Sequence, residues 1–148
     1  METNVKKETL QAAILTLHKA IEHYDKAQTL PYQPKVYQPL FNNQQELIEV
    51  TRDSMIKRFK YCVTGLLNCC KTYLKNSGEI TLESKSPRGV FKALCATRTI
   101  SEHDAELALE MVDARNATSH RYKEEQAELL ASKIRGFYEL ITKITSRV

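Results

Sequence analysis

Residues 130–144 read LASKIRGFYELITKI, and their apolar positions decide the fold class of this chain. Large apolar side chains recur at spacings of four, three, four and three residues, at Leu130, Ile134, Phe137, Ile141 and Ile144. That spacing puts all of them on one face of a helix, because an α-helix turns once in about 3.6 residues. A helix of about 24 residues around this stretch crosses a whole domain. We therefore expect long helices that pack against one another in antiparallel order.

The same periodicity continues toward the N-terminus and divides the chain into five predicted helices. The first predicted helix, residues 3–28, repeats the spacing with the stripe Leu10, Ile14, Leu17, Ile21 and Tyr24. The others cover about 44–75, 87–97, a segment that opens at Ser101, and the stretch quoted above. Ser86 before Pro87 is a typical helix start, and Ser101 with Asp104 has the spacing of a capping box.

One segment interrupts the pattern, and we expect it to form a loop at about 29–43. It contains three of the four prolines, and each proline restricts its own backbone and that of its predecessor. The prediction is therefore an all-α protein, a single domain spanning 1–148 that forms an antiparallel, up-and-down bundle of four or five helices.

Composition excludes several classes of protein. With 148 residues the chain has room for one domain, and its 4 glycines and 4 prolines are too few for the turns of a barrel or sandwich. No apolar run is long enough to span a membrane, and METNVKKETL has no apolar signal-peptide core, so we expect a cytoplasmic protein with no membrane partner. The 4 cysteines form no CxxC motif, so we expect neither a metal site nor a disulfide framework, and no cofactor.

Candidate site residues crowd into residues 115–122, RNATSHRY. On a continuing helix Asn116 and His120 share one face, as do Arg115 and Ser119. A helix end near Ser119 would let them converge with Tyr122. Such a cluster suits a phosphodiester, because arginine stabilises charge on phosphoryl oxygens and a histidine of near-neutral pKa transfers protons.

From the residues alone, a second interpretation stays open for this cluster: a polar helix terminus with only a capping role. The other histidines carry less chemistry. His18 and His23 lack partners at metal-ligand spacing, and His103 lies in the first turn of a predicted helix, where a charged imidazole is unfavourable.

At this point the chain resembles a known family. RNATSHRY is similar to the RX4HXY signature of the HEPN superfamily, specifically of the nucleotidyltransferase substrate-binding proteins, which include the HepT toxins. SPRGVFKALCA (86–96) resembles the SPRxVxxxA stretch before that signature, and DSMIKRFKYCVTGLLNCCKTYL (53–74) resembles the pattern IxRFEYxFExxWK. The resemblance covers about 5–145. The chain departs from the family's helix pattern at Thr64, Leu67 and Asn68, where the pattern has Glu, Trp and Lys. Its loop at 29–43 is also longer than the family's usual connection.

The resemblance implies roles for individual residues. Arg115 and His120 would form the RNA-cleaving pair, with Asn116 and Ser119 as supporting polar residues. Tyr122 would be the hydroxyl that a partner nucleotidylates, and Arg88 and Arg121 are candidates for binding phosphate or a nucleotide. The implied partners are a minimal nucleotidyltransferase (MNT-type), a second copy of this chain in a homodimer, and RNA or a nucleotide.

Three functions are compatible with these residues. The chain could be the HepT-like toxin of a toxin–antitoxin pair, a metal-independent endoribonuclease. It could instead be a non-catalytic module that binds a nucleotide or a nucleotidyltransferase, or a purely structural bundle. With neither a Walker loop nor a dinucleotide fingerprint, it is not expected to be the nucleotidyltransferase itself.

Overall fold

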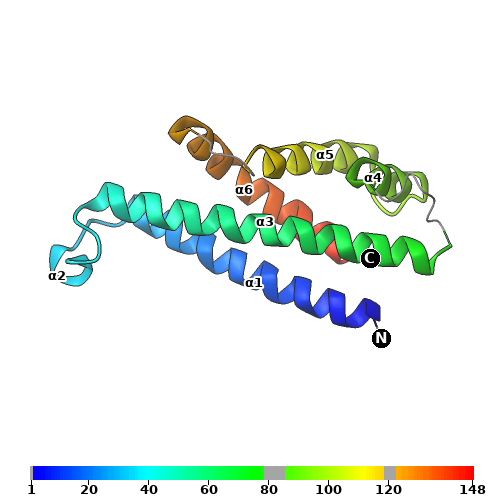
Figure 1. Cartoon of the computed structure of the whole chain (residues 1–148), viewed down its shortest axis with the longest axis horizontal. Helices are drawn as coiled ribbons and strands as arrows, with labels where there is room; N and C mark the ends of the chain where they lie inside the picture. The colour runs from blue at the N-terminus through cyan, green and yellow to red at the C-terminus, as the bar shows by residue number, and fades with distance from the viewer. Residues whose placement is uncertain (1, 79–85, 119–122) are drawn as a thin grey trace.

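The computed structural model describes residues 2–78, 86–118 and 123–148. Their helices are α1 (Glu2–Thr29), α2 (Pro34–Tyr37), α3 (Gln44–Asn76), α4 (Pro87–Ala96), α5 (Glu102–Ala117) and α6 (Glu124–Thr145), and no described residue belongs to a strand. Figure 1 shows α1 and α3 side by side; α6 packs on both of them, and α4 and α5 pack on α3. The predicted all-α antiparallel bundle is confirmed.

The connection between α1 and α3 differs from its prediction in one respect. Residues 29–43 were expected to contain no regular helix, yet α2 forms one turn there. Pro34 is its first residue, a position at which the missing N–H of proline costs nothing. Around it, the rings of Tyr32 and Tyr37 stack with centroids 5.7 Å apart, and the Tyr32 hydroxyl donates to the Phe41 carbonyl. Figure 1 shows α2 at one tip of the molecule.

Helix α3 is the element against which the others pack. It contacts α1, α4, α5 and α6, and its inward face is fully buried from Met55 to Leu74. The rings of Phe59 on α3 and Phe137 on α6 stack with centroids 5.6 Å apart. All five apolar positions of the stretch that predicted the last helix are buried. The core therefore forms along the stripes that the periodicity identified.

Side-chain caps fix the starts of α4 and α5 where the sequence predicted them. Ser86 Oγ accepts from the backbone N–H of Gly89 at 3.0 Å, and Ser101 Oγ accepts from that of Asp104 at 3.0 Å. The buried Asp104 carboxylate also pairs with Lys143 Nζ at 2.7 Å, which joins the start of α5 to the end of α6. The Lys143 ammonium holds the pKa of Asp104 below its usual value. Within the described residues, no helix has the length and apolar character that crossing a bilayer requires.

Gly65 lies where α3 packs tightly against α1. A Cβ atom at this position would lie 3.3 Å from Leu10 Cδ1 and 4.0 Å from Leu10 Cα. A larger side chain would therefore meet the α1 backbone itself. Gly136, on the exposed side of α6, would have nothing within 4 Å.

We predict that Gly65→Leu lowers the free energy of unfolding by about 1–2 kcal/mol, because overpacking outweighs the gain in helix propensity. The matched Gly136→Leu should raise it by about 0.5–1 kcal/mol, because leucine replaces glycine in an open helical position. Urea denaturation measures both. Equal effects of the two substitutions would contradict a close α1–α3 contact at Gly65.

Candidate functional site

The C-terminal end of α5 is fixed on α3. Thr118 caps this end, and its hydroxyl donates to the Arg115 carbonyl at 2.7 Å. Lys60 Nζ, from α3, donates to the Thr118 carbonyl at 3.3 Å. A cation is favourable there, because the unpaired carbonyls give a helix C-terminus a partial negative charge. The helix ends next to the predicted position near Ser119.

Arg115 has only neutral hydrogen-bond acceptors among the described residues. Its Nε and Nη2 donate to the side-chain carbonyl of Asn116 at 3.2 and 2.9 Å, and Nη1 lies 3.5 Å from Thr64 Oγ1 on α3. All these acceptors are neutral, and within the described residues no carboxylate pairs with Arg115. The guanidinium is held in place and its charge stays available to an anion.

The structure brings together two of the predicted site residues, Arg115 and Asn116. Ser119, His120, Arg121 and Tyr122 lie outside the described residues, and their roles stay predictions. Arg88 is exposed near the start of α4, and no hydrogen bond or ion pair described in the structure joins it to Arg115 or Asn116.

The start of α6 is held by a buried arginine of α3. The guanidinium of Arg52, 4% exposed, donates to both oxygens of Glu124, through Nη1 to Oε1 and through Nη2 to Oε2 at 3.2 Å. Its Nε and Nη2 also donate to Asp53 Oδ1 at 3.2 and 3.1 Å. Burial alone would lower the pKa of Arg52, but these carboxylates outweigh burial and raise it, while the hydrogen bond from Arg52 lowers the pKa of Glu124.

These contacts fix both sides of the signature segment to one helix. Lys60 holds residue 118 and Arg52 holds residue 124, and the two side chains start about 12 Å apart along α3, at a rise of about 1.5 Å per residue. The part of the chain that carries RX4HXY is therefore attached at both ends to α3.

Sequence reasoning missed the contribution of α3 to this site. Arg52, Lys60 and Thr64 contact the ends of α5 and α6, and none of them was predicted as a site residue. One indication was available: residues 54–78 contain five basic residues and no acidic one. Which of these basic residues face the signature depends on tertiary packing, which the periodicity did not resolve.

A cleft of about 570 Å³ between α1, α3 and α6 is a weaker candidate site. Its walls include Arg52 and Arg135, but Arg52 pairs with Glu124 and Asp53, and Arg135 pairs with Asp25. The cleft therefore offers an anionic ligand no uncompensated cation, whereas the end of α5 does.

No group of three metal-ligating side chains gathers within the part of the chain that the structure describes. The two most deeply buried cysteines are also unsuited to nucleophilic chemistry. Cys62 and Cys70 are buried, and burial raises the pKa of the Cys62 thiol to about 12, so it stays protonated at neutral pH.

The helical bundle has the fold of a HEPN toxin, as comparison with solved structures shows. A protein from Thermus thermophilus is 26% identical, with a TM-score of 0.62 over 88% of this chain and 97% of that chain. A tri-AMPylated Shewanella oneidensis HEPN toxin in complex with MNT antitoxin is 17% identical, with a TM-score of 0.63 over 93% and 94% of the two chains.

The chain belongs to the family described as nucleotidyltransferase substrate binding protein like, whose model matches residues 6–148. This confirms the resemblance inferred from the three motifs. No curated protein matches the chain in sequence.

We predict that Arg52→Met lowers the free energy of unfolding by about 1–3 kcal/mol, because it keeps the apolar stem but removes the buried guanidinium that joins α3 to α6. The control Arg135→Met removes an exposed pair with Asp25 and should cost less than about 1 kcal/mol. Urea denaturation of both variants measures the difference.

The pH dependence supplies a second readout. Because Arg52 lowers the pKa of Glu124 in the folded state, this stabilisation is present above about pH 4.5, the ordinary value, and is lost as pH falls through the folded pKa. The difference in free energy of unfolding between wild type and Arg52→Met should therefore become smaller as the pH falls below about 4.5. A difference in free energy of unfolding that grows in acid would contradict the pairing of Arg52 with Glu124.

Proposed function

We propose that this chain is the HepT-like toxin component of a toxin–antitoxin pair, the HEPN partner of a minimal nucleotidyltransferase. We further propose that it is a metal-independent endoribonuclease that acts in the cytoplasm through Arg115 and His120. The observation that carries this proposal is Arg115 itself, oriented by the neutral oxygens of Asn116 and Thr64 and left uncompensated by any described carboxylate. Family membership supports the choice of partner.

The proposed reaction uses the RNA as its own nucleophile. The ribose 2′-hydroxyl attacks the adjacent phosphorus, the P–O5′ bond breaks, and a cyclic 2′,3′-phosphate and a 5′-hydroxyl result. His120 would move the proton of the attacking or the leaving oxygen, and Arg115 would stabilise the charge that develops on the phosphoryl oxygens. Asn116 orients Arg115, and Ser119 is a proposed supporting donor. Arg121 and Arg88 are proposed phosphate contacts.

We also propose that the active form is a homodimer. One RX4H signature supplies one imidazole, whereas the reaction needs both a base and an acid. Two-fold pairing of the chain would supply a second His120 to the same cleft.

The partner would control this activity through Tyr122. The Shewanella oneidensis HEPN toxin, which shares this fold, is tri-AMPylated in a complex with MNT antitoxin. In the proposed step for this chain, the Tyr122 oxygen attacks the α-phosphorus of ATP, pyrophosphate leaves, and the phenol proton passes to solvent. The new phosphate would bring negative charge close to Arg115 and Arg121 and occupy the donors that RNA needs.

We predict that the purified protein cleaves single-stranded RNA in EDTA and that His120→Ala lowers the rate by about 10² to 10⁴. The matched control is His103→Ala, an exposed histidine in the first turn of α5, which should leave the rate unchanged. Gel analysis of end-labelled RNA measures cleavage, and light scattering of the same sample should give about twice the 17.0 kDa chain mass.

Two results would count against the metal-independent ribonuclease: a requirement for Mg²⁺, and full activity of His120→Ala. A stable monomer at micromolar concentration would contradict the proposed homodimer.

We predict that the cognate nucleotidyltransferase co-purifies with this chain and, with ATP, transfers nucleotide to it. Tyr122→Phe should abolish the transfer, because it removes the acceptor oxygen. Tyr61→Phe, at an exposed tyrosine of α3, should accept nucleotide normally. Intact-mass analysis decides: a chain that gains no mass, or gains it equally in Tyr122→Phe, would contradict the switch.

A further inference from the structure

A groove on α3 lies beside the signature and has no role in the proposed reaction. It has a volume of about 340 Å³ and is lined by Asp53, Ile56, Lys57, Lys60 and Tyr61; we refer to it as the Tyr61 groove. Lys57, Lys60 and Tyr61 are three and four residues apart, so they share one face of the helix. The Tyr61 side chain is 60% exposed, which is unusual for a large ring and leaves its face open to a ligand.

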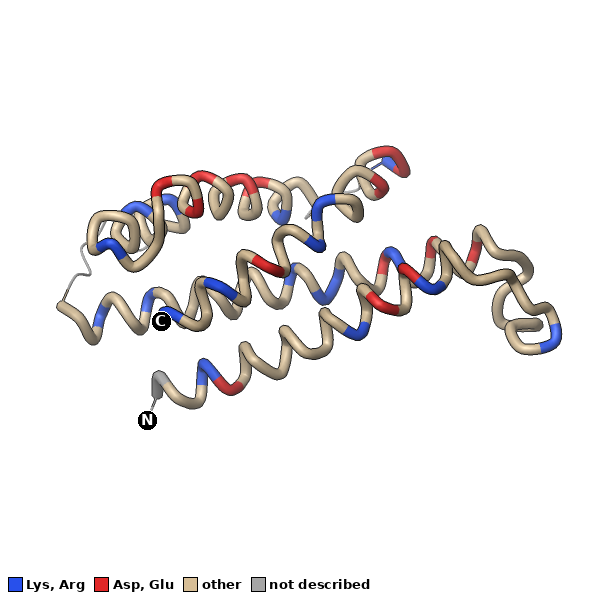
Figure 2. Tube along the Cα trace, turned by 180° about the vertical axis from the view of Figure 1, so that it is seen from behind, with Lys and Arg blue, Asp and Glu red and all other residues tan. Residues whose placement is uncertain are grey.

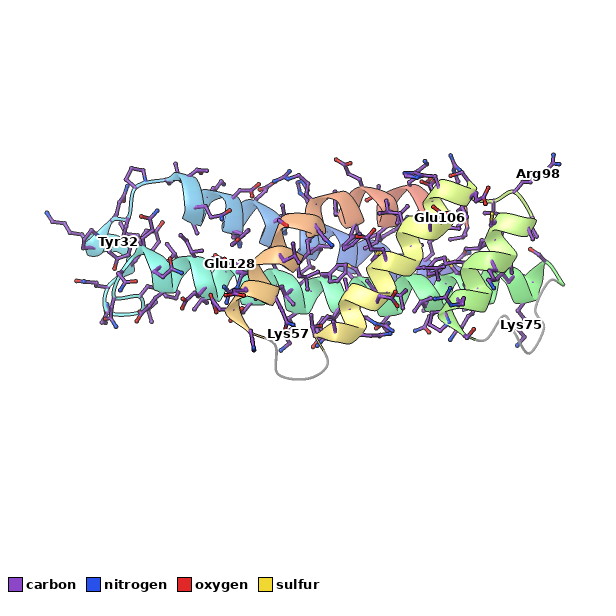
Figure 3. All side chains as sticks on the ribbon, turned by 90° about the horizontal axis from the view of Figure 1, so that it is seen from above. Tyr32, Lys57, Lys75, Arg98, Glu106 and Glu128 are labelled. Atoms are coloured by element: carbon purple, nitrogen blue, oxygen red, sulfur yellow. The ribbon has the colours of Figure 1, made fainter. Side chains whose placement is uncertain are left out.

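The groove is connected to the signature through described contacts. Lys60, in its wall, donates to the Thr118 carbonyl at the end of α5. One turn further along α3, Thr64 Oγ1 accepts a hydrogen bond from Arg115 Nη1 at 3.5 Å. Lys57, Lys60 and Arg115 therefore form a row that follows α3 for about 10 Å. In Figure 3 Lys57 projects beside the ends of α5 and α6, which agrees with the Lys60 contact.

The described part of the chain does not neutralise the charge of this row. Among the described residues Lys57 has no ion-pair partner, and residues 54–78 carry no acidic side chain at all. The one carboxylate in the groove, Asp53, already accepts two hydrogen bonds from Arg52. A polyanion can therefore approach the groove without repulsion from an unpaired carboxylate.

The outer face of α5 has the opposite charge. Figure 2 shows acidic residues along this helix, where Glu102, Glu106, Glu110 and Asp113 are all exposed. This distribution turns a polyanion away from α5 and toward the α3 side of the signature.

We propose that the Tyr61 groove binds the nucleotide next to the cleaved phosphate of a single-stranded RNA. Its base stacks on Tyr61, and its phosphate contacts Lys57 and Lys60. An exposed aromatic ring beside a row of cations is how proteins bind single strands with little sequence preference. The row extends from the groove to Arg115, so it fits a chain of phosphates better than a single mononucleotide. This inference rests on the proposed function, because it places the groove next to the reacting phosphate.

The test measures RNA binding separately from cleavage. Fluorescence anisotropy records the affinity of a labelled single-stranded RNA for the full chain carrying His120→Ala, so that the RNA stays intact. Adding Tyr61→Ala should weaken binding about tenfold, because stacking is lost, whereas Tyr61→Phe keeps the ring and should bind within about twofold. Circular dichroism of each variant checks that the bundle is folded.

The lysines are tested by the salt dependence of the same binding. Lys57→Gln should weaken binding and reduce the slope of log affinity against log salt by about 0.7, the value for one phosphate contact to a single strand. The matched control is Lys35→Gln on α2, at the far tip of the molecule in Figure 1, which should change neither quantity. Lys57 is substituted rather than Lys60, because Lys60 also holds the end of α5 and its loss would disturb the fold there.

The outcomes separate this inference from the proposed function. If Tyr61→Ala and Lys57→Gln bind RNA like the parent while His120→Ala abolishes cleavage, the groove inference is wrong and the ribonuclease stands. If both variants lose affinity but the chain never cleaves RNA, the groove binds RNA and the ribonuclease is wrong. If the variants keep their affinity for RNA but no longer bind the nucleotidyltransferase, the groove is a protein interface and the inference is overturned.

Discussion

The structure depends on α3 holding two helix ends that are separated in sequence by the signature. Lys60 donates to the last turn of α5, and Arg52 pairs with the first residue of α6. Both side chains leave the same helix, whose buried face includes Arg52 and forms the centre of the core. Residues 118 and 124 are therefore both held by α3, so the segment that the proposed function treats as catalytic is attached to the same helix on either side.

The two anchors differ in what they do to the local charge. Arg52 meets two carboxylates, so it holds α6 without adding a net positive charge to the surface. Lys60 meets a backbone carbonyl, which restrains it and leaves its charge in place. Arg115 is likewise held by neutral oxygens. Among the described residues, Lys60 and Arg115 are thus held at the end of α5 by neutral acceptors, so their charges are not neutralised. A site for phosphate requires such uncompensated cations, whereas an ion pair that only stabilises the fold would neutralise them.

The sequence predicted the helices well, because their evidence is local. The spacing from Leu130 to Ile144 and the caps at Ser86 and Ser101 depend on neighbours within one or two turns, and each was found as predicted. The helix at Pro34 was missed, since proline disfavours a helix interior but suits its first position. The α3 half of the site could not be predicted, because Lys60 and Thr118 are 58 positions apart and only packing brings them together.

Thr64 shows how one departure from a family pattern changes the chemistry of a site. It stands where the helix pattern that this chain resembles has glutamate, and it lies 3.5 Å from Arg115 Nη1. A carboxylate at this distance would pair with the guanidinium and compete with a phosphate for its donors. The threonine hydroxyl orients the same group and leaves its full charge available. In this chain, therefore, the contact from α3 positions Arg115 without neutralising the charge that the proposed function assigns to an RNA phosphate.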